Sequence, residues 1–136
     1  MNFLLDTVVV SEIRKKVPNV GVQAWFASVS ADQLYLSVLV VGKIRERIER
    51  LARRDPRQAE VLELWLEELV DVYSDRIVPV TLDVAERCGR LDIPNRALMI
   101  DGLLAATALV YDWTLVTRNG SFIASTGVRL LDPFEA

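Results

Sequence analysis

Short apolar runs alternate with longer amphipathic segments along this chain. The apolar runs have the length of buried strands, and polar or turn-forming residues bound each of them. They lie at residues 2–5, 34–38, 77–80, 114–117 and 128–131. Strands that alternate with helices indicate an α/β protein with a parallel sheet. The sequence has no repeat, low-complexity segment or interdomain linker, so we expect a single domain over residues 1–136.

The segments between these runs carry apolar residues at helical spacing. They predict a helix that begins at residue 7, and further helices over residues 20–29, 41–54, 57–73, 81 or 83 to 91, and 100–111. Asp55-Pro56, a helix start signal, joins the two long helices, which we expect to form a helical hairpin. Arg118-Asn119-Gly120 predicts a turn after the fourth strand. The expected fold is a short parallel sheet flanked by helices, with this hairpin inserted.

Two acidic residues stand where a parallel sheet exposes its ligand-binding edge. Asp6 ends the first apolar run, and Asp101 begins the helix of residues 100–111. Strand C-termini and helix N-termini meet at that edge, so we expect Asp6 and Asp101 to lie close together. A divalent cation would relieve the repulsion between their carboxylates. Each residue also has a structural interpretation, Asp6 as a helix cap and Asp101 as an acid that complements a helix dipole.

The amino-acid composition excludes several classes of catalytic and metal site. The sequence contains no histidine, which excludes Ser-His-Asp and Cys-His catalysis and histidine-ligated zinc. Carboxylates without histidine or a cysteine cluster suit hard cations such as Mg²⁺ or Mn²⁺. Cys88 is the one cysteine, which fits a buried packing residue in a cytoplasmic protein, and no apolar run reaches the length of a membrane span. The net charge of −3 gives no general basic footprint for nucleic acid, but it allows a local basic patch.

Several sequence blocks together carry a family resemblance. They are Phe3-Leu-Leu-Asp-Thr7 with Val10-Ser-Glu12, Leu36-Ser-Val38 with Gly42, Asp101-Gly-Leu-Leu-Ala-Ala-Thr-Ala108, Leu115-Val-Thr-Arg-Asn119, and Thr126-Gly-Val-Arg129 with Pro133-Phe134. In this order they resemble PIN-domain proteins, most closely VapC-type toxins of bacterial toxin–antitoxin pairs in the FitB-like branch. The resemblance implies a Mg²⁺-dependent endoribonuclease, a homodimer, an RNA substrate, and a small VapB-type antitoxin that wraps the toxin and blocks its site.

The resemblance also locates an acidic site from which this chain departs. The first and third family acids are Asp6 and Asp101, which the resemblance makes the catalytic metal ligands. The asparagine usual two residues after the first acid is Val8, and the family's glutamate is Lys43. Counted without gaps, the position of the fourth acid is Phe122. Two acids of the usual four are therefore kept, and one of the lost acids has become a cation.

Lys43 changes the electrostatics that the resemblance implies. We expect its ammonium to reach towards Asp6 and Asp101 and to weaken Mg²⁺ or Mn²⁺ binding. Thr117 and Arg118 are candidate phosphate contacts, although Arg118 also fits a solvated turn residue. Two functional interpretations stay open: a Mg²⁺-dependent endoribonuclease toxin, or a catalytically weakened or inactive PIN-domain protein that mainly binds its antitoxin. The departures from the family are compatible with natural decay and with engineering.

The helix over residues 41–54 is rich in arginine. Its basic side is either a solvated face or, near the acidic edge, a surface that follows an RNA backbone or receives acidic residues of an antitoxin. We expect the antitoxin groove between residues 41 and 73, with some of Leu62, Leu66 and Leu69 as exposed apolar anchors.

Overall fold

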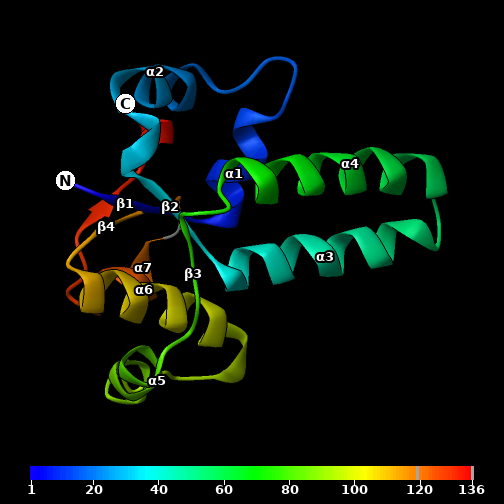
Figure 1. Ribbon diagram of the computed structural model, residues 1–136. Coiled ribbons are helices and arrows are strands. Elements are labelled where there is room, and N and C mark those ends of the chain that lie inside the picture. The colour runs from blue at the N-terminus through cyan, green and yellow to red at the C-terminus, as the bar shows by residue number, and fades with distance from the viewer. Residues whose placement is uncertain (119, 136) are drawn as a thin grey trace.

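A five-stranded parallel sheet lies at the centre of the computed structural model, which describes residues 1–118 and 120–135 (Figure 1). The strands are β1 (Phe3–Leu5), β2 (Leu34–Ser37), β3 (Ile77–Val78), β4 (Thr114–Val116) and β5 (Leu130–Leu131). Their order is β3-β2-β1-β4-β5, and every neighbouring pair is parallel. In the central strand, Phe3 pairs with Leu34 on one side and with Thr114 on the other. The predicted parallel sheet is confirmed.

Helices cover the sheet and connect its strands. They are α1 (Thr7–Ile13), α2 (Val20–Ser28), α3 (Val38–Ala52), α4 (Pro56–Val72), α5 (Leu82–Gly89), α6 (Met99–Tyr111) and α7 (Ser121–Ala124). Short 3₁₀ turns occupy Ala31–Gln33, Arg96–Leu98 and Pro133–Glu135. None of the helices in the described ranges is long and apolar enough to cross a membrane.

Local capping explains where most of these helices begin. The side chains of Asn19, Asp55 and Thr81 accept hydrogen bonds from backbone N–H groups in the first turns of α2, α4 and α5. α3 begins at Val38 instead of residue 41, because the Ser37 side chain accepts from the backbone N–H of Leu39. α7 was not predicted, and Asn119 of the predicted turn lies outside the described residues.

The predicted helical hairpin is present, and it projects away from the sheet as a pair of antiparallel helices, α3 and α4 (Figure 1). Its apolar stripes face each other, with Ile44 and Ile48 of α3 buried. Leu62, Leu66 and Leu69 of α4 are only 2%, 3% and 9% exposed. The prediction that they form exposed anchors is wrong, because the apolar side of α4 packs against α3. The predicted buried packing of Cys88 is confirmed, since it lies against Val84 and Ala106.

Candidate active site

Asp6 follows the central strand at the C-terminal edge of the sheet. Its backbone N–H donates to the carbonyl oxygen of Val116 on β4, at 3.0 Å, and the residue is only 3% exposed. Its Oδ1 accepts from the N–H of Thr7, and its Oδ2 accepts from the hydroxyl of Thr117, both at 2.7 Å. Asp6 therefore stands at the N-cap of α1 as well as at the site. Each carboxylate oxygen has two lone-pair positions, so the two hydrogen bonds leave acceptor capacity for a ligand.

Asp101 lies in the first turn of α6 and is half-buried. Burial raises the pKa of Asp101, the negative charge of Asp6 raises it further, and Lys43 lowers it. Asp6 and Lys43 thus both act electrostatically on Asp101, although the three residues come from distant parts of the sequence. We call Asp6 and Asp101 the acid pair. A carboxylate whose pKa is raised by burial and by a neighbouring carboxylate is a recurrent feature of functional sites.

The three departures from the family pattern line two cavities, and one of these cavities includes Asp101. Phe122 lines a small cavity of about 120 Å³ together with Asp101. Val8 and Lys43 line a separate cavity on the α1 and α3 side. Lys43 is exposed, and within the described ranges it has no ion pair with either carboxylate at 4.0 Å or less. Its influence on Asp101 is therefore exerted over a longer distance than direct contact.

The two candidate phosphate contacts have different surroundings. Thr117 is buried and donates to Asp6, so it positions a carboxylate of the acid pair. Arg118 is exposed, and its guanidinium lies 4.2 Å from the centre of the Phe134 ring. This cation–π contact restrains Arg118 at the edge of the site.

The cavity lined by Val8 and Lys43 is larger than the cavity beside Asp101, and its lining includes Thr7, which follows Asp6. It has a volume of about 430 Å³ and is lined by Thr7, Val8, Ser11, Glu12, Lys15, Lys43, Arg47 and Arg118. We call it the basic cavity. Sequence reasoning missed Thr7, Ser11 and Lys15 as parts of the site. Their spacing of four residues along one segment was the available signal, because in a helix it places Thr7 and Ser11 on the same side of α1, and Lys15 follows the end of that helix.

Glu12 is the single carboxylate in the lining of the basic cavity. It accepts from Lys15 Nζ at 2.8 Å and from the backbone N–H of Asn19 at 2.9 Å. The hydrogen bond from Lys15, followed by that from Asn19, lowers the pKa of Glu12. Glu12 therefore joins the end of α1 to the start of α2 and partly neutralises Lys15.

The two carboxylates of the acid pair are enough to bind a hard cation, but they supply few of its ligands. Mg²⁺ is commonly held by one or two carboxylates, with waters and substrate phosphate completing its coordination. The raised pKa of Asp101 reflects a repulsion that such a cation would relieve. The described residues contain no group of three or more His, Cys, Asp or Glu placed to hold a metal. Lys43 is an opposing charge in the same region.

Comparison with known proteins places the chain in a family. It belongs to the PIN domain family, whose model matches residues 3–126. It is 32% identical over 139 residues to toxin FitB of Neisseria gonorrhoeae, covering 97% of this chain and 98% of that protein. It is 28% identical over 138 residues to VapC ribonuclease Y4jK of Sinorhizobium fredii, covering 97% of each.

Solved structures agree with this assignment. The crystal structure of FitAcB from Neisseria gonorrhoeae superposes with a TM-score of 0.86 at 28% identity, covering 98% of this chain and 99% of that chain. The resemblance seen in the sequence and the PIN-type α/β fold are both confirmed. The VapC-type nucleases of this family generally depend on a divalent metal.

Proposed function

We propose that this protein is the toxin of a bacterial type II toxin–antitoxin pair and that it acts as a Mg²⁺-dependent endoribonuclease. The observation that carries the proposal is the acid pair at the C-terminal edge of a PIN-type sheet, where Asp6 acts electrostatically on Asp101. Relatives matched over nearly their whole length are named a toxin and a VapC ribonuclease. RNA as substrate and a cytoplasmic location belong to the same proposal.

In this mechanism Asp6 and Asp101 would hold the metal ion, which when bound supplies an activated water and neutralises charge on the scissile phosphate. Thr117 holds the Asp6 carboxylate in one orientation through its hydroxyl. Pairing of Asp6 with Val116 fixes the backbone beneath that carboxylate. Arg118, restrained by Phe134, would bind a phosphate oxygen of the substrate.

A second candidate function has specific support. The PIN fold would be kept while the chemistry is weakened, leaving a protein that mainly binds its antitoxin. Phe122 beside Asp101 supplies no ligand, and the positive charge of Lys43 opposes a cation. The two candidates differ in whether the isolated protein cleaves RNA when Mg²⁺ is present.

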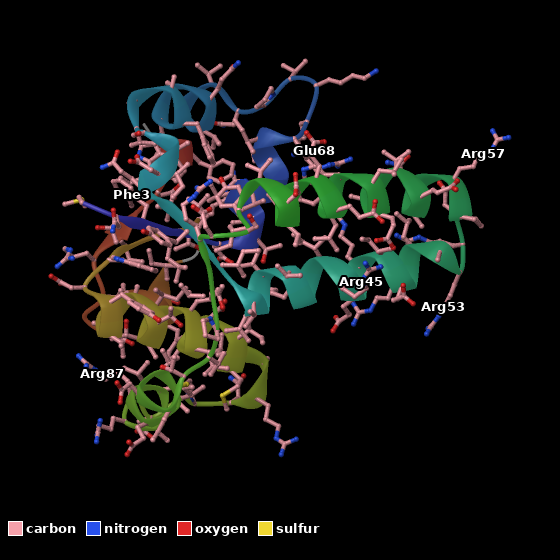
Figure 2. All side chains as sticks on the ribbon, viewed as in Figure 1. Phe3, Arg45, Arg53, Arg57, Glu68 and Arg87 are labelled. Atoms are coloured by element: carbon pink, nitrogen blue, oxygen red, sulfur yellow. The ribbon has the colours of Figure 1, made fainter. Side chains whose placement is uncertain are left out.

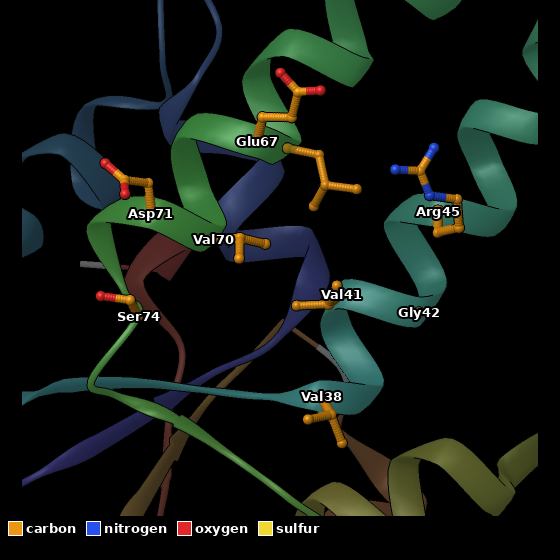
Figure 3. Close-up of a pocket in the computed structure, with 9 residues that line it drawn as sticks. Val38, Val41, Gly42, Arg45, Glu67, Val70, Asp71 and Ser74 are labelled. Carbon is orange, nitrogen blue, oxygen red and sulfur yellow. The ribbon is translucent and has the colours of Figure 1, made fainter.

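The proposed antitoxin site is a groove of about 700 Å³ at the base of the helical hairpin, which we call the hairpin groove. Figure 3 shows Val38, Val41 and Arg45 on the α3 side, with Glu67 and Val70 on the α4 side. Apolar residues with charged neighbours suit an amphipathic segment of a small antitoxin. We also propose a homodimer, which light scattering of the purified toxin and of its antitoxin complex would test.

Cleavage of a mixed RNA pool tests the proposed function. We expect the parent protein to cut RNA with Mg²⁺ or Mn²⁺, and chelator to stop the reaction. Asp6→Asn and Asp101→Asn should each abolish cleavage while circular dichroism stays unchanged. Cleavage that persists in chelator or in Asp6→Asn would refute the role of the acid pair. A parent that does not cleave RNA but binds its antitoxin would favour the second candidate.

A further inference from the structure

We propose that the basic cavity binds the backbone phosphates of single-stranded RNA without a metal ion and leads the strand to the acid pair. The inference deepens the proposed function, because it assigns a substrate path to the same site. It is separable from catalysis, since binding to this cavity needs neither a metal ion nor an intact acid pair.

Four cations from different segments of the chain line the basic cavity. Lys15 follows α1, Lys43 and Arg47 lie on α3, and Arg118 follows β4. Against these four cations the lining contains one carboxylate, Glu12, which already accepts from Lys15 and Asn19. Cations that converge in a concave site focus the potential that attracts a polyanion.

Among the described residues, the basic residues of α3 divide into an ion-paired group and an unpaired group. Arg45 is paired with Glu63 through two hydrogen bonds of 2.5 and 2.6 Å, and Arg50 is paired with Glu46 at 2.8 Å. Lys43 and Arg47 form no ion pair with any residue in the described part of the chain. The two basic residues of α3 that line the cavity are therefore the ones on this helix left available for a ligand.

In the described part of the chain, the Thr7 side chain brings a hydroxyl without a hydrogen-bond partner to the cavity. Thr7 Oγ1 is buried and has no hydrogen-bond partner among the described residues, which is unusual for a buried polar atom. Thr7 lines the basic cavity and directly follows Asp6. A phosphate oxygen seated in the cavity would give this hydroxyl an acceptor.

The occupant that these observations favour is RNA and not an acidic protein segment. Val8 is the one large apolar side chain in the lining, whereas a docked helix needs several apolar anchors. The apolar hairpin groove that would suit such a helix lies elsewhere. A volume of about 430 Å³ is that of a small-ligand pocket, which suits part of one strand better than the width of a duplex.

Two residues of the cavity lining are adjacent in the chain to residues of the site, which supports a path of the RNA strand from the cavity to the acid pair. Thr7 follows Asp6, and Arg118 follows Thr117, whose hydroxyl holds Asp6. A phosphate between Thr7 and Arg118 would therefore place the neighbouring linkage near Asp6. Lys43 would contact the strand at the position where the family resemblance expects a metal-binding glutamate.

The test is fluorescence anisotropy of a short labelled single-stranded RNA with the full-length protein in chelator, over a range of salt concentrations. We expect the logarithm of the association constant to fall by about 0.7 for each tenfold rise in salt concentration and each phosphate neutralised. Arg47→Glu should weaken binding about tenfold and flatten the salt dependence by roughly one phosphate. Thr7→Val should weaken binding less, without changing the salt dependence.

The matched control is Arg57→Glu. Arg57 is also exposed and the charge change is the same, but it lies at the far tip of the hairpin (Figure 2). We expect parental affinity for this variant. Equal losses in Arg47→Glu and Arg57→Glu would overturn the inference, because net charge alone would then explain binding. Equally tight binding of duplex RNA or of a polyglutamate peptide would overturn it as well.

Asp6→Asn separates this inference from the proposed function. In chelator we expect Asp6→Asn to bind the RNA at least as tightly as the parent, since one negative charge beside the cavity is removed. A parent that binds RNA in this way but does not cleave it would refute the proposed nuclease activity and leave the inference intact. If the parent cleaves RNA and Arg47→Glu binds RNA as tightly as the parent, the inference about the basic cavity is refuted and the proposed nuclease activity is kept.

Discussion

Lys43 places a positive charge where the PIN-family resemblance expects a negative one, so the charge near the acid pair differs by two units. Each unit at about 8 Å changes the energy of a bound dication by about 1–4 kcal/mol at an effective dielectric of 80 to 20. Lys43 is exposed and makes no direct ion pair with the acid pair, so solvent places its effect at the lower end of this range. The side chain still lowers the pKa of Asp101, which shows that its charge reaches the site.

Lys43→Glu should therefore strengthen divalent binding by about tenfold to a hundredfold, because every 1.4 kcal/mol is tenfold. Mn²⁺ titration calorimetry and RNA cleavage with Mg²⁺ measure the gain. Lys43→Gln, which removes the charge without adding a ligand, should give a smaller gain. Adding Asp6→Asn to Lys43→Glu should abolish it. If the parent binds Mn²⁺ as tightly as Lys43→Glu does, the ammonium has no influence on the metal.

Thr7 provides a second prediction at the level of single residues. A buried polar group without a partner costs about 1–3 kcal/mol, and Thr7 Oγ1 is such a group among the described residues. Thr7→Val keeps the shape of the side chain and removes the hydroxyl. We expect the free energy of unfolding to rise by about 1 kcal/mol in urea denaturation. Thr7→Ser keeps the hydroxyl and should give no rise, whereas equal stabilities of parent and Thr7→Val would show that the hydroxyl is satisfied.

At the scale of elements, the junction of α1 and α2 depends on an ionised Glu12. Its lowered pKa means that the folded state favours the charged carboxylate. The stability that Glu12 contributes is present above the ordinary glutamate pKa of about 4.3 and is lost as the pH falls through the lower folded-state pKa. Glu12→Gln should therefore be less stable than the parent at neutral pH.

The loss in Glu12→Gln should disappear in strongly acidic buffer, where the parent carboxyl is protonated as well. Urea unfolding at the two pH values measures this. Glu60→Gln, on the exposed side of α4, is the control and should match the parent at both pH values. A deficit of Glu12→Gln that is independent of pH would mean that packing, and not the charge, is responsible.

Elements fixed by neighbouring residues were predictable, and those fixed by distant contacts were not. The capping residues Asn19, Asp55 and Thr81 act within one turn, so the sequence shows them directly. The periodicity of α4 gives an apolar stripe but does not say what covers it. Some of Leu62, Leu66 and Leu69 were therefore expected at the surface, although all three are buried. The four-residue helix α7 begins after Gly120, which has no side chain to cap it, so local capping does not fix this element.

The same distinction between neighbouring residues and distant contacts applies to the site. The prediction that Asp6 and Asp101 meet follows from the edge rule of parallel sheets, which depends only on strand and helix ends, and it stays a prediction. The basic cavity could not be predicted, since it needs the orientation of α3 relative to α1. Lys15, Arg47 and Arg118 are ordinary surface cations in the sequence, and only the packing of three elements gathers them.

At the scale of the whole molecule, the charged and the apolar functional surfaces use different parts of α3. Lys43 and Arg47 line the basic cavity with residues of α1. Val38, Val41 and Arg45 line the hairpin groove with residues of α4. One helix thus lies between the proposed substrate path and the proposed antitoxin site. An antitoxin seated in the groove would be positioned to affect the cavity through α3.

The last prediction tests the hairpin groove with two exposed valines of the same helix. Val70 lines the groove and is 37% exposed, whereas Val61 lies outside the groove lining and is 50% exposed. In Val70→Asp, antitoxin binding would bury an unpaired carboxylate, which costs at least about 3 kcal/mol and weakens the complex more than a hundredfold. Val61→Asp should bind like the parent. Co-expression with the antitoxin and titration calorimetry measure both variants, and equal affinities would show that the antitoxin binds elsewhere on the molecule.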